Sequence, residues 1–164
     1  MRAVTAILCQ SGRILLLKRS QFMPTMPGLW SAVSGTIEGD ETIPYRMRTE
    51  IHEETGIVDI RSLSSCSTKI TEGIWLHSVL CLAHGNVRLN SENVAYRWIR
   101  PTDLTLYDTV PALNSILLLL LGSVGALAGE HYVNACTATH CTGHIISWML
   151  AGSCMYTSGF FGVY

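Results

Sequence analysis

Apolar positions over the first hundred residues fall in short continuous runs or alternate with polar ones, a pattern typical of β-strands with a buried face. Two of these runs stand on either side of a Ser-Gly turn, which predicts an antiparallel hairpin. Four further β-rich runs follow, separated by segments rich in Gly, Pro or polar residues. The predicted strands are residues 3–10, 14–19, 29–37, 57–63, 74–85 and 95–101.

A helix is predicted between the third and fourth of these strands. Thr42 can cap its amino terminus, Pro44 is tolerated in its first turn, and Gly56 ends it. Apolar or small residues recur at every fourth position and form a core-facing stripe of Met47, Ile51 and Thr55. A second, closing helix is expected over residues 108–121. Strands and helices in this order indicate an α/β (α+β) layered domain.

Charge is distributed unevenly along the 164 residues. All 11 Lys and Arg residues lie at or before Arg100, and Glu130 is the only acidic residue after Asp108. The chain therefore has an ordinary first zone and an apolar second zone. The net charge of −1 and the absence of a basic block predict no extended nucleic-acid surface.

The first residues contain too short an apolar run for a signal peptide, and we therefore expect a cytoplasmic location. In that compartment cysteines remain reduced, so buried thiols are expected rather than disulfides. The six cysteines are Cys9, Cys66, Cys81, Cys136, Cys141 and Cys154.

Three carboxylates, those of Glu50, Glu53 and Glu54, are concentrated on the predicted helix. Their i+3 and i+4 spacing places them on one side of the helix within one turn, where like charges repel. Two interpretations remain open on this segment alone. The first is a solvated helix face, and the second is a site for a hard cation such as Mg²⁺, which prefers carboxylate oxygens and substrate phosphates.

The surrounding stretch, GTIEGDETIPYRMRTEIHEETGI at residues 35–57, resembles the Nudix box. That motif is a glycine, five residues, Glu, seven residues, and then Arg-Glu-apolar-x-Glu-Glu-x-Gly-apolar. Eight of its nine defining positions match, and Thr49 stands where the family has arginine. Features outside the box extend the resemblance over residues 1–120, which we take as a Nudix hydrolase domain. Residues 121–164 form an apolar tail of unknown role.

The resemblance implies a Nudix-type α/β/α sandwich with a mixed central sheet. It also implies a pyrophosphohydrolase that acts on acid anhydrides, namely nucleoside diphosphates linked to another moiety such as a sugar. Mg²⁺ or Mn²⁺ is the implied cofactor, and a bound ion neutralises the diphosphate and lowers the pKa of its water. Carried over by position, the metal ligands are Glu50, Glu53, Glu54 and the carbonyl of Gly35, with Glu53 or Glu50 as the catalytic base.

Glu41 is implied to be structural, because the family pairs it with the arginine that Thr49 replaces. Arg46 and Arg48 are the candidates to supply the missing cation. Loss of the pair favours an alternative function, a Nudix-fold module that binds a nucleotide or protein with weak or no catalysis. The intact carboxylates favour the hydrolase. An isoprenoid diphosphate isomerase is a third interpretation, for which no catalytic residue can be assigned.

Substrate choice depends on residues outside the box. Arg19, at the end of the second strand, is the candidate for a phosphate contact, although a solvated strand end explains it equally well. Large aromatics are more often core residues than base-stacking platforms. Those concerned are Trp30, Trp75 and Tyr96, and the candidates for a further carboxylate are Glu72 and Glu92.

The tail admits several interpretations. Residues 110–129 and 145–164 are uncharged and each long enough to cross a bilayer, but no Lys or Arg flanks them to set an orientation. The His and Cys residues between 131 and 144 lack a complete zinc-ligand spacing. Two more interpretations of the tail are a homodimer interface and a poorly ordered segment.

Overall fold

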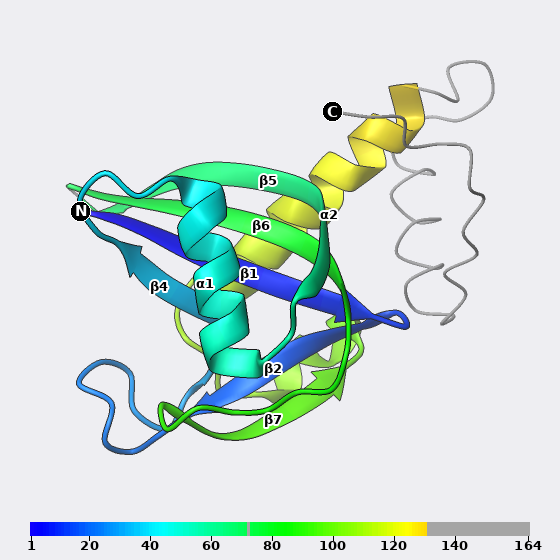
Figure 1. The fold of residues 1–164 in the computed structure, drawn as a ribbon. Helices are drawn as coiled ribbons and strands as arrows, with labels where there is room; N and C mark the ends of the chain where they lie inside the picture. The colour runs from blue at the N-terminus through cyan, green and yellow to red at the C-terminus, as the bar shows by residue number, and fades with distance from the viewer. Residues whose placement is uncertain (72, 131–164) are drawn as a thin grey trace.

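A seven-stranded mixed sheet with an α-helix on each face makes up the fold (Figure 1). The structure, a computed structural model, describes residues 1–71 and 73–130. The elements are β1 (Arg2–Gln10), β2 (Arg13–Arg19), β3 (Trp30–Ser31), β4 (Val33–Ile37), α1 (Ile43–Thr55), β5 (Asp59–Thr71), β6 (Ile74–His84), β7 (Asn93–Ile99), the 3-10 helix η1 (Pro101–Leu106) and α2 (Leu113–Glu130). The predicted α/β layered class is confirmed.

Strand β1 lies at the centre of the sheet. It pairs in parallel with β6 along nearly its whole length, from Arg2 opposite Trp75 to Cys9 opposite Leu82. On its other edge the first half of β1 pairs with β4, and only its last two residues pair with β2. Strand β2 in turn pairs with β3 and β7, while β5 pairs with β6. The sheet therefore divides beside β1, with β4 in one branch and the β2, β3 and β7 strands in the other.

Both faces of β1 and β2 are buried, which explains their continuous apolar sequences. Successive side chains point to opposite faces of a strand. In β1, Val4, Ala6 and Leu8 pack in the core beneath α1, whereas Ile7 and Cys9 pack in the core beneath α2. In Figure 1 α1 covers the near face of the sheet and α2 the far face.

The element boundaries differ most from the sequence prediction in three places. The predicted strand over residues 29–37 is two strands broken at Ala32, because β3 pairs with β2 and β4 with β1 after those two strands diverge. Strand β5 continues through a serine-rich segment to Thr71, held by its pairing with β6. The closing helix begins at Leu113 rather than at residue 108, after Pro111 and a left-handed Ala112, and η1 was not predicted.

Helix α2 continues from Leu113 to Glu130, past residue 120, where the predicted Nudix domain ends. No helix within residues 1–71 and 73–130 is long and apolar enough to cross a membrane. The second apolar segment, the tail His and Cys residues and Glu72 lie outside the described residues. Cys9 and Cys81 are buried, Cys66 is half-buried, and none of the three forms a disulfide.

Candidate active site

Helix α1 carries three of the acidic residues of the site, and its ends are fixed as the sequence predicts. The Thr42 hydroxyl accepts a hydrogen bond from the Tyr45 backbone N–H at 3.4 Å. Gly56 ends the helix in the left-handed conformation, and its N–H donates to the His52 carbonyl at 2.8 Å. The predicted core stripe of Met47, Ile51 and Thr55 is buried. Because this stripe is buried, one neighbouring face of α1 lies against β4 and another faces solvent.

Glu54 is almost completely buried between α1, β4 and β7. One of its carboxylate oxygens accepts a hydrogen bond from the Ser34 backbone N–H at 2.9 Å, and the other accepts one from the Asn93 side-chain amide, also at 2.9 Å. Burial raises the pKa of Glu54 from 4.5 to about 7, against the lowering effect of these two hydrogen bonds. Asn93 was not a predicted site residue, because one asparagine before a strand carries no sequence signal of its role.

Glu50 is also buried and lies directly against the backbone of β4. A Cβ built on Gly35 would overlap its carboxylate, so the absence of a side chain at Gly35 creates the space that Glu50 fills. Arg46 contacts the same carboxylate, with 2.5 Å between its Nη2 and Oε1 of Glu50. Burial nevertheless raises the pKa of Glu50, outweighing the lowering effect of Arg46, and the charges of Glu53 and Glu92 add to the increase.

Arg46 also connects Glu50 to the loop that precedes α1. Its Nη1 lies 3.9 Å from Oε1 of Glu41, whose other oxygen accepts a hydrogen bond from the Glu38 backbone N–H at 3.0 Å. Burial acts to lower the pKa of Arg46, but the nearby carboxylates, chiefly Glu50, raise it overall. The Nε atom of Arg46 is buried and has no hydrogen-bond partner among the described residues. Of the two predicted candidates, the structure thus places Arg46 against Glu41.

Arg48 and Thr49 take no part in that ion pair. Arg48 is exposed and forms no ion pair within the described part of the chain, whereas Thr49 is half-buried. Glu53 is exposed on α1, one turn from Glu50. The three carboxylates that the sequence places on one side of the helix thus differ in burial, because Glu50 and Glu54 are buried and Glu53 faces solvent.

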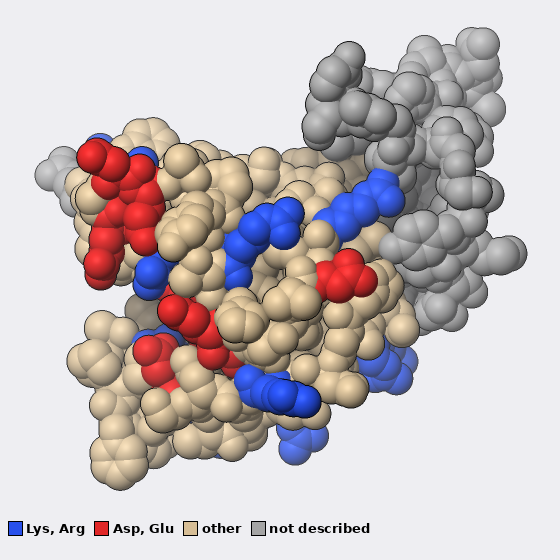
Figure 2. All heavy atoms as spheres, viewed as in Figure 1, with Lys and Arg blue, Asp and Glu red and all other residues tan. Residues whose placement is uncertain are grey.

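A fifth carboxylate approaches from another part of the chain. Glu92, in the loop before β7, is exposed and immediately precedes Asn93, whose side-chain amide donates to Glu54. The charge of Glu92 helps to raise the pKa of both Glu50 and Glu54. We call these five residues the carboxylate cluster: Glu41, Glu50, Glu53, Glu54 and Glu92. Figure 2 shows acidic atoms over α1 and the loop that precedes it.

The carboxylate cluster consists of oxygen ligands, the type that a hard divalent cation prefers. Arg46 is the only Lys or Arg that forms an ion pair with it among the described residues, so the cluster keeps an excess of negative charge. No three His, Cys, Asp or Glu side chains in that part of the chain form a ready-made cage. Mg²⁺ commonly takes one or two carboxylates and completes its shell with water and substrate phosphates. Glu50, Glu53 and the Gly35 carbonyl offer such a partial set, and the ligand assignment stays a prediction.

The substrate candidates outside the box are spread over the molecule. Arg19 donates from Nε and Nη2 to the backbone and side-chain oxygens of Thr25, both at 3.1 Å, and so holds the loop after β2. Trp75 and Tyr96 are exposed, contrary to the expectation of core residues. Trp30 packs edge-on against Tyr107 at 5.4 Å between ring centroids.

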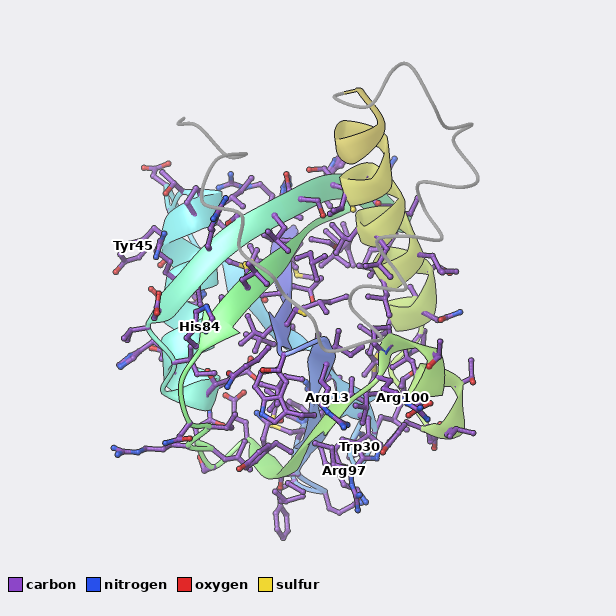
Figure 3. All side chains as sticks on the ribbon, turned by 90° about the vertical axis from the view of Figure 1, so that its right-hand side faces the viewer. Arg13, Trp30, Tyr45, His84, Arg97 and Arg100 are labelled. Atoms are coloured by element: carbon purple, nitrogen blue, oxygen red, sulfur yellow. The ribbon has the colours of Figure 1, made fainter. Side chains whose placement is uncertain are left out.

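The environment of Trp30 is cationic and lies away from the box helix. The Nζ atom of Lys18 is 5.7 Å from the Trp30 ring centroid, and Cζ of Arg97 is 6.0 Å from it. Trp30 packs against the hydrophobic core beneath α2, whereas α1 packs on the core of the other sheet face, and Figure 3 shows Trp30 well separated from Tyr45 of α1. The structure therefore does not bring Trp30 to the carboxylate cluster.

Known proteins resemble this chain in both sequence and structure. A family model described as NUDIX domain matches residues 1–120. Nucleoside triphosphatase NudI from Escherichia coli O139:H28 (strain E24377A / ETEC) is 28% identical over 120 residues, covering 64% of this chain and 85% of the relative. A MutT NUDIX hydrolase from Burkholderia pseudomallei superposes with a TM-score of 0.56 at 26% identity, covering 71% of this chain and 95% of that one.

A more distant structural neighbour was solved with ligands. The bifunctional NMN adenylyltransferase/ADP ribose pyrophosphatase from Francisella tularensis, complexed with AMP and a Mn ion, superposes with a TM-score of 0.64 at 18% identity. The match covers 75% of this chain and 41% of that protein. At this identity the likeness concerns the fold alone.

Proposed function

The chain belongs to the Nudix family, and we propose that it hydrolyses the pyrophosphate bond of a nucleoside diphosphate linked to another moiety, such as a nucleotide-sugar. It is a Nudix pyrophosphohydrolase that acts on nucleoside diphosphate derivatives. The observation that carries the proposal is the buried Glu50 carboxylate, seated where a side chain on Gly35 would be, with Glu53 exposed one turn away. This arrangement offers oxygen ligands that a diphosphate can complete.

The proposed roles within the cluster follow from burial. Glu50 is held from two sides, by Arg46 and by the β4 backbone, and suits the role of a fixed metal ligand. Glu53 is exposed, so its carboxylate can both bind the ion and orient and deprotonate water. A divalent ion, when bound, neutralises the diphosphate and lowers the pKa of its water. Both carboxylate oxygens of Glu54 already accept a hydrogen bond, so only their remaining lone pairs are available to a metal ion.

Glu54 has a second role that its position supports. Its two hydrogen bonds join α1 to β4 through Ser34 and to β7 through Asn93. The carboxylate cluster is thereby fixed to two strands that lie in different branches of the sheet. A rigid support of this kind keeps catalytic groups within the small tolerance that productive geometry allows.

A nucleoside triphosphate is the second candidate substrate. The relative NudI is a nucleoside triphosphatase, and its similarity favours this choice. A nucleoside triphosphate contains the same anhydride bond between phosphorus atoms, with phosphate as the second moiety. Glu50, Glu53 and the Gly35 carbonyl would hold the divalent ion that binds the shared diphosphate, whereas residues beyond the box would distinguish the two classes.

A substrate panel tests the proposal. Purified protein is incubated with nucleotide-sugars, ADP-ribose, dinucleotide polyphosphates and nucleoside triphosphates, each with Mg²⁺ and with Mn²⁺, and the products are separated by ion-exchange chromatography. A nucleoside monophosphate plus a sugar phosphate identifies the first class, and a monophosphate plus pyrophosphate identifies the second. Absence of product from every compound with both metals would refute the proposed function.

Two variants assign the chemistry to the cluster. Glu53→Gln keeps the shape of an exposed side chain but removes its charge, and turnover should fall at least about 100-fold. Asp59→Asn is the matched control, because Asp59 is an exposed acidic residue at the start of β5, outside the cluster. Equal turnover of the two variants would remove Glu53 from the proposed chemistry.

A further inference from the structure

A cation three positions earlier on α1 stands in for the arginine that the box lacks at Thr49. We propose that Arg46 is the positioning residue of this site, connecting the loop before α1 to the metal-binding carboxylate Glu50. The inference rests on the proposed function for the role of Glu50. It assigns to Arg46 an effect on metal affinity, which a purely structural contact would not have.

The first half of the connection runs through the loop. The Glu38 backbone N–H donates to Oε2 of Glu41 at 3.0 Å, which closes the turn between these residues. Nη1 of Arg46 lies 3.9 Å from the other oxygen of Glu41. Because both partners are three-quarters or more buried, solvent screens this pair less than it would an exposed one. The position of the loop is thus tied to that of the Arg46 guanidinium.

The second half runs from Arg46 to β4. Nη2 of Arg46 contacts Oε1 of Glu50 at 2.5 Å, and the Glu50 carboxylate fills the space beside Gly35. The Arg46 guanidinium therefore links the loop before α1, through Glu41, to β4, through Glu50. A planar guanidinium has several donors in a fixed fork and can hold two carboxylates at once. Removing it leaves Glu50 buried beside other carboxylates without a compensating cation.

Helix geometry explains why position 46 can replace position 49 and position 48 cannot. Residues separated by three are neighbours on a helix surface, turned by only about 60°. Arg48 is only one position from Thr49, but one residue turns the helix by about 100°, so its side chain lies on a neighbouring face. Arg48 is accordingly exposed. Arg46 fills the role imperfectly, because its buried Nε–H finds no acceptor among the described residues.

This arrangement predicts that the effect of arginine at position 49 depends on position 46. In the wild type, Thr49→Arg brings a second guanidinium next to Arg46, where like charges repel, so metal affinity should not improve. In an Arg46→Ala background the same substitution supplies the only cation and should restore affinity. Such a dependence on the residue at position 46 indicates that the two positions share one site for a single guanidinium.

The test is a double-mutant cycle on the full chain. Wild type, Arg46→Ala, Thr49→Arg and the double variant are titrated with Mn²⁺, and free Mn²⁺ is followed by electron paramagnetic resonance. Melting temperature and turnover are recorded for the same proteins. Arg48→Ala is the matched control, since it removes an arginine of the same helix that has no ion pair in the described residues.

Arg46→Ala should weaken Mn²⁺ binding about 10-fold, as expected when a group that orients a metal ligand is removed. The double variant should recover to within about threefold of the wild type, and Arg48→Ala should stay within about twofold. If Thr49→Arg strengthens Mn²⁺ binding equally in both backgrounds, the proposal is overturned. It is also overturned if Arg46→Ala lowers only the melting temperature and leaves Mn²⁺ affinity unchanged.

Arg46→Lys keeps the test decisive should the alanine variant fail to fold. Lysine preserves the positive charge but not the forked set of guanidinium donors. The Mn²⁺ affinity of Arg46→Lys should therefore lie between that of the wild type and that of Arg46→Ala. If Arg46→Ala does not fold, the affinity of Arg46→Lys should simply be below that of the wild type. Wild-type affinity in Arg46→Lys would overturn the bridging role. Because Mn²⁺ binding is measured without substrate, these results stand even if no nucleotide is hydrolysed, and failure of the proposed function is distinguishable from failure of this inference.

Discussion

The buried carboxyl of Glu54 makes the stability of the metal-free protein depend on pH. Burial raises its pKa from 4.5 to about 7. Between these two pH values the folded protein holds a proton on Glu54 that the unfolded chain has released. Stability therefore falls as pH rises through this window, because the unfolded state binds fewer protons. The contribution of Glu54 is fully present below pH 4.5 and is lost as pH rises through about 7.

The size of the effect follows from the width of the window. Each pKa unit corresponds to about 1.4 kcal/mol, so the interval between 4.5 and about 7 amounts to about 3 kcal/mol in the free energy of unfolding. That is a large part of the total stability of an ordinary domain, about 5–15 kcal/mol. Glu50 adds to the trend in the same direction, since burial raises its pKa as well.

Comparison with Glu54→Gln isolates the effect of Glu54. Glutamine cannot ionise and can still accept the Ser34 hydrogen bond, although its amide group opposes the Asn93 donor. Urea unfolding of both proteins is measured in the presence of a chelator at several pH values from about 4.5 to 8.5, which span the window. The free energy of unfolding of Glu54→Gln minus that of the wild type should increase by about 3 kcal/mol across this range.

Asp59→Asn provides the control for removing an acidic side chain, because Asp59 is exposed and lies outside the carboxylate cluster. Its difference from the wild type should remain flat to within about 0.5 kcal/mol. The same flat profile for Glu54→Gln would refute the reasoning, since a carboxyl that costs nothing to ionise in the fold is not buried as described.

Three further predictions concern the site and the core. Gly35→Ala should push the Glu50 carboxylate aside and lower turnover about 100-fold, whereas Gly122→Ala, where a Cβ meets nothing within 4 Å, should keep wild-type turnover in the same assay. Removing divalent ions with a chelator should abolish hydrolysis, and adding Mg²⁺ or Mn²⁺ in excess should restore it; hydrolysis that persists in chelator would contradict a metal-dependent site. Leu120→Ala, at a fully buried position of α2, should cost about 2–5 kcal/mol in urea unfolding. Leu118→Ala, at a position 59% exposed on the same helix, should change stability by less than about 0.5 kcal/mol.

Local signals in the sequence were sufficient for the box helix and the first hairpin. Thr42 and Gly56 act on their own neighbours, so their capping roles can be recognised without knowledge of the fold. The turn between β1 and β2 likewise needs only Ser11 and Gly12, both with positive φ. The spacing of Glu50 and Glu53 on a helix is a local property too.

Features that depend on distant segments were not predictable. The break at Ala32 arises because two partner strands diverge, which the run of strand-forming residues does not record. Asn93 reaches Glu54 across 39 positions of sequence, and nothing near Asn93 indicates it. Helix angles could exclude Arg48 as the partner of Glu41, but the contact with Arg46 also depends on where the loop places Glu41.

The central position of β1 has a consequence for synthesis of the chain. Its long parallel partner, β6, lies about 70 residues downstream, from Trp75 to Leu82. At typical translation rates of about 5–20 residues per second, one edge of β1 waits roughly 4–14 s for that partner to leave the ribosome. During this interval β1 presents unpaired backbone groups on a strand whose two faces are apolar, a combination prone to intermolecular pairing. Yield of native protein should therefore depend on chaperones that bind nascent chains during this interval.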